Sequence, residues 1–180
     1  ALITTRQQPC SIFVPMHWND QFASSARVDR LVPGITDPIS GQPASKNIPA
    51  RIERFVAVTY GFAVLRRKPE HIPAEYWAIA KCNGGWRAEI AFANEPADWP
   101  TFARGLLGRA GEPVAYEDAQ TGRRRFAAYD NGHLTGMLFL APEPVAVSRD
   151  WAISQLAGAD AALSKRNSVL AGRPGVGAFD

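Results

Sequence analysis

The feature that most constrains the fold is a long irregular segment, residues 12–46, which reads IFVPMHWNDQFASSARVDRLVPGITDPISGQPASK. It opens as an apolar stretch, continues as polar loop and closes on Lys46. Irregular segments longer than about 12–15 residues are uncommon in compact domains and are often functional. The composition changes near residue 55, where this polar segment gives way to apolar, strand-like sequence. The sequence therefore predicts a domain boundary there.

Apolar, β-branched stretches on the N-terminal side of the boundary predict strands at residues 1–6 and 11–15, with a loop at 16–49. Residues 50–67 are rich in Val, Phe and Tyr, which predicts two strands or one long strand bent near Gly61. The chain begins in the middle of strand-like sequence and ends in a Gly/Pro-rich stretch. We therefore expect a piece of a larger chain, with residues 172–180 as a linker to a missing downstream segment.

Turn and cap signals organise the second part of the chain. The Asn83-Gly84-Gly85 turn predicts a hairpin, Asp98 predicts the start of a helix that Gly108 ends, and Ser148 predicts the start of another. We detect no internal repeat. The expected elements are strands at 76–82 and 86–93, a helix to Leu107, a meander at 113–118, 124–129 and 134–141 with a turn at 130–132, a helix after 148, and a last helix at about 160–170. This order predicts a strand-rich α+β fold.

Composition excludes several classes of protein. The 180 residues are 46% hydrophobic and 21% charged, which is ordinary for a globular chain, and no apolar run is long enough for a transmembrane helix. Cys10 and Cys82 lie far apart and form no metal-binding spacing, so we expect free thiols in a reducing compartment. The sequence contains no HExxH, GxSxG or GxxxxGK[ST] pattern, so no catalytic or metal-binding residue is predicted.

The net charge is a mildly basic +3, and the arginines are scattered apart from two runs, Arg66-Arg67-Lys68 and Arg123-Arg124-Arg125. A run of this kind is either a solvated face or a patch that binds an anionic partner. No zinc finger, helix-turn-helix or RNA-binding signature accompanies the runs, so we expect neither a nucleic-acid partner nor a membrane partner.

The charges within residues 12–46 suggest a ligand. Arg27, Asp29, Arg30 and Lys46 supply fixed charges, with His17 beside them in the sequence. Such a set could hold a polar, anionic heterocycle, because a lysine can bind phosphate and a carboxylate can accept from ring N–H groups.

Four stretches carry a resemblance to a known family: FVPMHW at 13–18, ARVDRL at 26–31, TDPISGQP at 36–43, and Lys46. Their order and spacing resemble the end of the molybdopterin-dinucleotide-binding domain of molybdenum oxidoreductases, and most of all bacterial assimilatory nitrate reductase. The resemblance implies that residues 1–55 are the C-terminal piece of a double-psi β-barrel. Residues 56–171 then resemble the C-terminal α+β extension of some assimilatory nitrate reductases.

The resemblance also implies cofactor-binding residues. Lys46 takes the position of the family's cofactor-binding lysine, and Met16 and His17 take positions that face the pterin. Asp29 stands where the family has asparagine; an ionised aspartate accepts hydrogen bonds but cannot donate them. The implied cofactor of the parent is Mo-bis-molybdopterin guanine dinucleotide, with iron–sulfur clusters bound elsewhere in the parent.

The resulting functional hypothesis is a C-terminal fragment of a cytoplasmic, molybdenum-dependent nitrate reductase, which reduces nitrate to nitrite with two electrons. The fragment alone would not be catalytically competent. Its implied partners are the upstream catalytic domains and a downstream [2Fe–2S] domain or a flavin-containing electron donor. Two alternatives stay open: formate dehydrogenase or another member of the same superfamily, and a non-catalytic α+β module that binds an anion or a partner through Arg123–Arg125.

Overall fold

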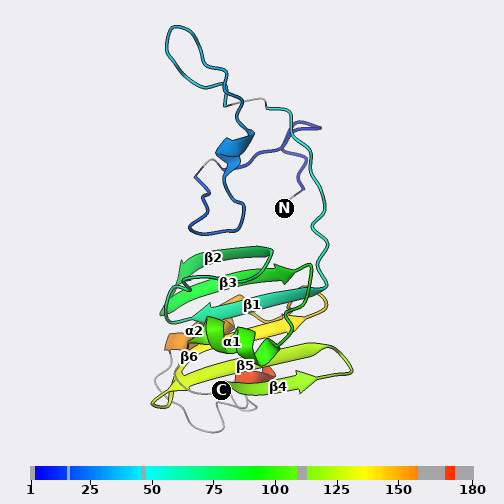
Figure 1. The fold of residues 1–180 in the computed structure, drawn as a ribbon, viewed down its shortest axis with the longest axis vertical. Helices are drawn as coiled ribbons and strands as arrows, with labels where there is room; N and C mark the ends of the chain where they lie inside the picture. Colours follow the sequence, from blue (N-terminus) through cyan, green and yellow to red (C-terminus); the bar gives the residue numbers. More distant parts are fainter. Residues whose placement is uncertain (1–2, 16, 46–47, 109–112, 158–168, 173–180) are drawn as a thin grey trace. The chain divides into compact units, whose positions relative to one another are not determined.

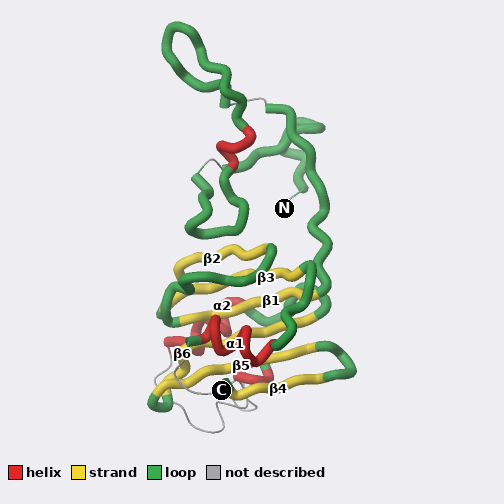
Figure 2. The backbone as a smooth tube through the Cα atoms, in the orientation of Figure 1, coloured by secondary structure: helices red, strands yellow, loops and turns green. Residues whose placement is uncertain are grey.

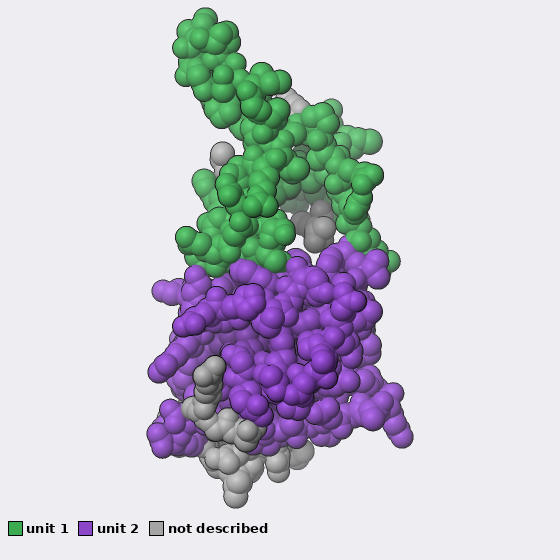
Figure 3. All heavy atoms as spheres, viewed as in Figure 1, with its two compact units in different colours: residues 1–54 green, residues 55–180 purple. Residues whose placement is uncertain are grey.

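A computed structural model describes residues 3–15, 17–45, 48–108, 113–157 and 169–172 (Figure 1). The chain divides into two compact units, residues 1–54 and 55–180 (Figure 3). We call them unit 1 and unit 2.

Unit 2 is built on one six-stranded sheet in which every neighbouring pair is antiparallel, so the strand-rich α+β fold is confirmed. The strand order across the sheet is β2-β3-β1-β6-β5-β4 (Figure 1). The elements are β1 (Thr59–Leu65), β2 (Tyr76–Cys82), β3 (Gly85–Phe92), α1 (Trp99–Leu107), β4 (Val114–Asp118), β5 (Arg123–Asp130), β6 (His133–Ala141) and α2 (Arg149–Ala157).

Each face of the sheet carries one helix and one apolar core. Successive residues of a strand point to opposite faces. On β1, therefore, Ala63 and Leu65 join the core that contains α1, whereas Phe62 and Val64 join the core that contains α2. Helix α1 packs against β5 and β6, and α2 packs against β1 and β6. Strands β1 and β6 are thus covered on both faces, which explains their nearly continuous apolar sequence.

Local sequence signals set the helix starts and the turns. The Asp98 side chain accepts a hydrogen bond from the Thr101 N–H (3.3 Å), and Ser148 Oγ accepts one from the Trp151 N–H (3.3 Å). In the β5–β6 turn Asn131 and Gly132 both have positive φ, at 47° and 83°, which is the backbone conformation that an Asn-Gly turn provides. The hairpins, the meander and the two capped helices therefore lie where the sequence predicts them.

The structure contains an internal repeat that the sequence analysis missed. A hairpin, an x-Glu-Pro loop and a nine-residue helix occur twice, as β2-β3-α1 and as β5-β6-α2. Glu95-Pro96 and Glu143-Pro144 occupy matching places in the two loops. On each side of β1 lies the second strand of one hairpin, β3 or β6, followed by its first strand, β2 or β5. The two helices lie on opposite faces of the sheet. The repeat escapes a search for sequence identity because the two copies share little beyond the Asn-Gly turn and the Glu-Pro pair of the loop, whereas the helix caps are Asp98 in one and Ser148 in the other.

Unit 1 has little regular structure among its described residues (Figure 2). It contains one short 3₁₀ helix, η1 (Val28–Leu31), and an isolated bridge between Thr36 and Pro43. The strands predicted at 1–6 and 11–15 are wrong as far as residues 3–15 are described, because no neighbouring strand pairs with them. A β-branched stretch without a pairing partner does not form a ladder.

Two further predictions need correction or fall outside the description. Residues 50–67 form a single strand, Thr59–Leu65, with no bend at Gly61. Gly61 instead allows close packing, since a Cβ there would lie 3.1 Å from Leu140 Cδ2 and 3.3 Å from Ile90 Cβ. Most of the helix predicted at 160–170 lies outside the described residues, and residues 169–171 are helical.

Candidate functional site

Local hydrogen bonds hold the loop at residues 36–43 of unit 1. Asp37 Oδ1 accepts hydrogen bonds from the backbone N–H of Ile39 (3.1 Å), the backbone N–H of Ser40 (2.7 Å) and the Ser40 hydroxyl (2.9 Å). These bonds hold the pKa of the Asp37 carboxyl below its ordinary value. The Asp37 N–H donates to Gln42 O (2.9 Å), and Gly41, with φ of 69°, donates back to Asp37 O (2.9 Å). The DPxS motif thus builds a fixed turn, and it presents Ile39 with 95% of its surface exposed.

Asp29, one of the predicted cofactor-binding residues, lies in η1 and is already paired. Arg27 Nη2 donates to Asp29 Oδ2 at 3.0 Å, and both side chains are largely exposed. The hydrogen bond lowers the pKa of Asp29 and raises that of Arg27. Asp29 is therefore an ionised, exposed acceptor that Arg27 already engages.

Of the four predicted cofactor-binding residues, the structure describes His17 and Asp29. His17 is exposed, and no described contact links it to Asp29. Met16 and Lys46 lie outside the described residues. The assignment of all four residues stays a prediction.

The Arg123–Arg125 run does not form a single cationic patch, because strand alternation divides it between the two faces of the sheet. Arg124 lies beside Trp99 of α1 and between two carboxylates, at 3.8 Å from Glu95 and 3.6 Å from Glu117. The other two arginines line a pocket on the α2 face.

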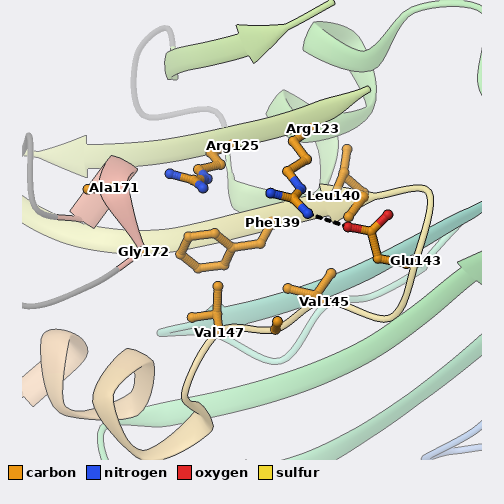
Figure 4. Close-up of a pocket in the computed structure, with 11 residues that line it drawn as sticks. Arg123, Arg125, Phe139, Leu140, Glu143, Val145, Val147, Ala171 and Gly172 are labelled. Carbon is orange, nitrogen blue, oxygen red and sulfur yellow. Dashed lines mark hydrogen bonds and ion pairs between the residues drawn. The ribbon is translucent and has the colours of Figure 1, made fainter. Parts of the chain in front are cut away.

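This pocket, of about 430 Å³, lies between β5, the end of β6 and the loop that leads to α2 (Figure 4). Arg123 forms an ion pair with Glu143, which raises the pKa of Arg123. Arg125 donates to Leu170 O (2.7 Å) and lies over the Tyr116 ring at 5.4 Å. The pocket is lined by Arg123, Arg125, Phe139, Leu140, Ala141, Glu143, Val145, Ala146, Val147, Ala171 and Gly172.

The contacts of the two arginines limit what this pocket can bind. Glu143 neutralises Arg123, so an anion would have to compete with an internal carboxylate. Arg125 donates one of its five N–H groups to the carbonyl of Leu170, and its other N–H groups could bind an anion. A small anion held by Arg125 alone is the most that the described geometry offers, which weakens the hypothesis of an anion-binding arginine run. The signal for this division was present in the sequence, since neighbouring strand residues alternate between faces.

A second pocket, of about 630 Å³, lies at the corresponding loop of the first hairpin. There Glu75 accepts hydrogen bonds from Asn94 Nδ2 (3.1 Å) and from the backbone N–H groups of Asn94 and Ala93. These bonds lower the pKa of Glu75. Neither pocket is lined by His17 or Asp29.

Other chemistry in the described residues is limited. No group of three or more His, Cys, Asp or Glu side chains among them is arranged to hold a metal ion. Within the same residues, no helix has both the length and the apolar character needed to cross a membrane. Cys10 and Cys82 are both free, as predicted, and partial burial raises the pKa of the Cys82 thiol.

Comparison with known proteins finds one similarity that bears on function. The chain is 38% identical over 94 residues, 52% of its length, to a protein from Klebsiella oxytoca described as a nitrate reductase. The matched region is only 11% of that protein, so the chain spans a small part of its relative. No family model matches the chain, and no solved structure matches it. The similarity supports a relationship to nitrate reductases.

Proposed function

We propose that this chain is a C-terminal portion of a molybdenum-dependent nitrate reductase. In this proposal residues 1–55 complete a double-psi β-barrel that binds Mo-bis-molybdopterin guanine dinucleotide, and residues 56–171 form an attached α+β module. The observation that carries the proposal is the 38% identity over 94 residues to a nitrate reductase. The parent would reduce nitrate to nitrite in the cytoplasm.

The exposed apolar side chains of unit 1 support the proposal that this unit packs against further domains of a longer chain. Among its described residues, Ala26 is the one buried hydrophobic residue. Large apolar side chains are instead exposed, including Ile3 at 98%, Phe13 at 78% and Trp18 at 58%. A segment with so little core cannot offset its conformational entropy by itself. Packing against upstream domains of a longer chain would cover these side chains.

The fit of the implied cofactor to this chain is incomplete. Asp29 is exposed and could accept from a pterin or guanine N–H only beside its bond from Arg27, and His17 is exposed. Neither of the two pockets described above is lined by these two side chains, and we assign no catalytic step to the chain. In the proposal the cofactor supplies the redox chemistry, and the chain contributes part of the wall that holds it.

The module at residues 56–171 would dock either a flavin-containing electron donor or a [2Fe–2S] domain. What supports this role is its resemblance to an extension of assimilatory nitrate reductases, together with its complete two-faced core. Removing residues 56–171 from the parent should slow turnover that is driven by the physiological donor and spare turnover that is driven by a small dye. If donor-driven turnover stayed intact, the docking role would be wrong.

The test of the proposal uses the full-length protein that carries this sequence. Nitrate-dependent oxidation of a reduced viologen dye is measured beside formate-dependent dye reduction, and the molybdenum content is determined on the same sample. Nitrate turnover would support the proposal, whereas formate turnover alone would move the substrate to the formate dehydrogenase alternative. Purified protein without molybdenum would refute the proposal.

A pair of variants sharpens the test at the cofactor. Lys46→Met should lower the molybdenum and pterin content, because it removes the proposed cation for a cofactor phosphate. Lys165→Met removes the same charge elsewhere in the chain and should leave the cofactor content unchanged. Equal cofactor content in the two variants would contradict the role of Lys46.

A further inference from the structure

We propose that one end of the unit 2 sheet is a docking surface for a protein partner that carries an acidic patch. This surface, the basic end, consists of five side chains: Arg66, Arg67, Lys68, Lys81 and Arg87. It lies where β1 ends and where β2 turns into β3 (Figure 1). The inference rests on charge and geometry alone and does not require the proposed redox role.

Strand pairing brings these residues together from three separate segments. Leu65, which precedes the Arg66–Lys68 run, lies opposite Trp86, and Lys81 lies opposite Trp86 from the other side. The approach is close, because a Cβ added to Gly85 would lie 3.0 Å from Arg66 Cα. Arg87 follows Trp86 on β3 and points to the opposite face of the sheet. Lys81 and Arg87 therefore lie on opposite faces of the sheet at this end, and Arg67 lies in the loop that follows β1.

Three of these cations have no internal partner to neutralise them. Arg67, Lys81 and Arg87 are exposed, and within the described residues their side chains form no ion pair and no hydrogen bond. Arg66 differs, since it donates to Leu134 O (2.6 Å) and Leu156 O (2.7 Å) and ties α2 to the β5–β6 hairpin.

The arginines at the other end of the sheet show the contrast. Arg123 pairs with Glu143, and Arg124 lies between two carboxylates. Within the described residues, the unpaired cations Arg67, Lys81 and Arg87 therefore favour an anionic partner at the basic end.

The aromatic side chain at this surface favours a protein over a nucleic acid. Single-stranded nucleic acids bind to aromatic rings on which bases can stack. Trp86 is half-buried, and Lys68 Nζ already lies over its ring at 5.4 Å from the centroid. That face of the ring is occupied by an ammonium group. The carboxylates of a protein surface need only separated cations, and they do not need an open aromatic ring such as a nucleic-acid base would stack on. The basic end therefore suits an acidic protein surface better than a nucleic acid.

The test measures binding of the full 180-residue chain to fluorescein-labelled poly-L-glutamate by fluorescence anisotropy at low salt. The variant Arg67→Glu/Lys81→Glu/Arg87→Glu reverses the three unpaired charges. The control Arg6→Glu/Arg30→Glu/Arg54→Glu makes the same change in net charge at exposed positions of unit 1. We expect the first variant to bind about tenfold more weakly, since each exposed ion pair contributes roughly a factor of two. The control should lose clearly less affinity than this variant, because it changes the net charge equally but leaves the basic end intact.

Three results would overturn the inference. The wild-type chain could fail to bind poly-L-glutamate, or the two variants could lose affinity equally, which would reduce the effect to net charge. Tighter binding of labelled oligothymidylate than of poly-L-glutamate, lost in the same basic-end variant, would assign the surface to nucleic acid instead. The assay involves neither molybdenum nor nitrate, so its outcome is separate from that of the proposed function.

Discussion

Replacing Arg149 by alanine should destabilise unit 2 more than any other single change of a partly exposed charge. Arg149 Nε and Nη2 donate to the two oxygens of Glu89, at 3.0 and 2.9 Å, and Nη1 donates to Val145 O (2.6 Å) and Val147 O (2.8 Å). The guanidinium carbon also lies 4.3 Å from the centroid of Phe62. One side chain thus connects β1, β3 and the start of α2.

The magnitude follows from these contacts. A bidentate pair that is partly exposed contributes about 0.5–1 kcal/mol. Each hydrogen bond from the charged donor to a carbonyl contributes about 1 kcal/mol, and the contact with the Phe62 ring about 0.5 kcal/mol. Arg149→Ala should therefore lower the free energy of unfolding by about 3 kcal/mol. For a unit of this size that corresponds to a fall in Tm of about 10 °C.

The assay is urea denaturation followed by circular dichroism, with two comparison variants. Arg123→Ala breaks an ion pair in which both side chains are about half exposed, at 50% and 52%, and should destabilise far less than Arg149→Ala. Arg149→Lys can keep the charge but not the forked geometry, so it should recover less than half of the loss. If Arg149→Ala cost no more than Arg123→Ala, the reasoning from donor satisfaction would be refuted.

Three further predictions concern other parts of the chain. A Cβ at Gly85 would lie 2.0 Å from Leu65 O, whereas nothing lies within 4 Å of a Cβ at Gly105 in α1. In urea denaturation, Gly85→Ala should therefore destabilise unit 2 by about 2 kcal/mol or more, and Gly105→Ala should stabilise it by about 0.5–1 kcal/mol. Equal effects of the two substitutions would contradict the close approach at Gly85. The pKa of the Asp37 carboxyl in the folded chain lies below its ordinary 3.8. The ionised carboxylate should therefore stabilise the turn above pH 3.8, and this stabilisation should be lost as the pH falls through the lowered pKa. Carboxyl NMR titration measures this pKa, and a value at or above 3.8 would contradict the hydrogen bonds to Asp37. Amides of residues 3–54 should exchange with deuterium far faster than those of β1, because few side chains of unit 1 are buried. Comparable protection in the two segments would mean that unit 1 has a core that the side-chain exposures do not show.

The parts of the fold that follow from local chemistry were predictable from the sequence. The turns at 83–85 and 130–132 and the caps Asp98 and Ser148 define hairpins and helices without reference to the rest of the chain. The order of the strands was not predictable in this way, because it depends on which apolar faces meet. The strands expected at 1–6 and 11–15 failed for the same reason, since strand propensity without a pairing partner leaves the backbone irregular.

The candidate site shows a similar division. The turn at Asp37 follows from the short-range preferences of Asp, Pro and Ser, and its hydrogen bonds lie within a few residues. The basic end could not be found as one run, because strand pairing assembles it from residues 66–68, 81 and 87. The Arg123–Arg125 run was conspicuous in the sequence but is divided between two faces.

The central position of β1 has a consequence for how the chain is made. β1 is the first strand in sequence, yet its second neighbour is β6, the last strand: Tyr60 lies opposite Ala141 and Leu65 opposite Gly136. During synthesis β1 can pair with β3 early, but its other edge stays open until β6 has emerged. An open apolar edge recruits other chains. A nascent or truncated chain that stopped before β6 would therefore tend to aggregate through β1. Pairing of β6 with β1 is the step that covers this edge of β1.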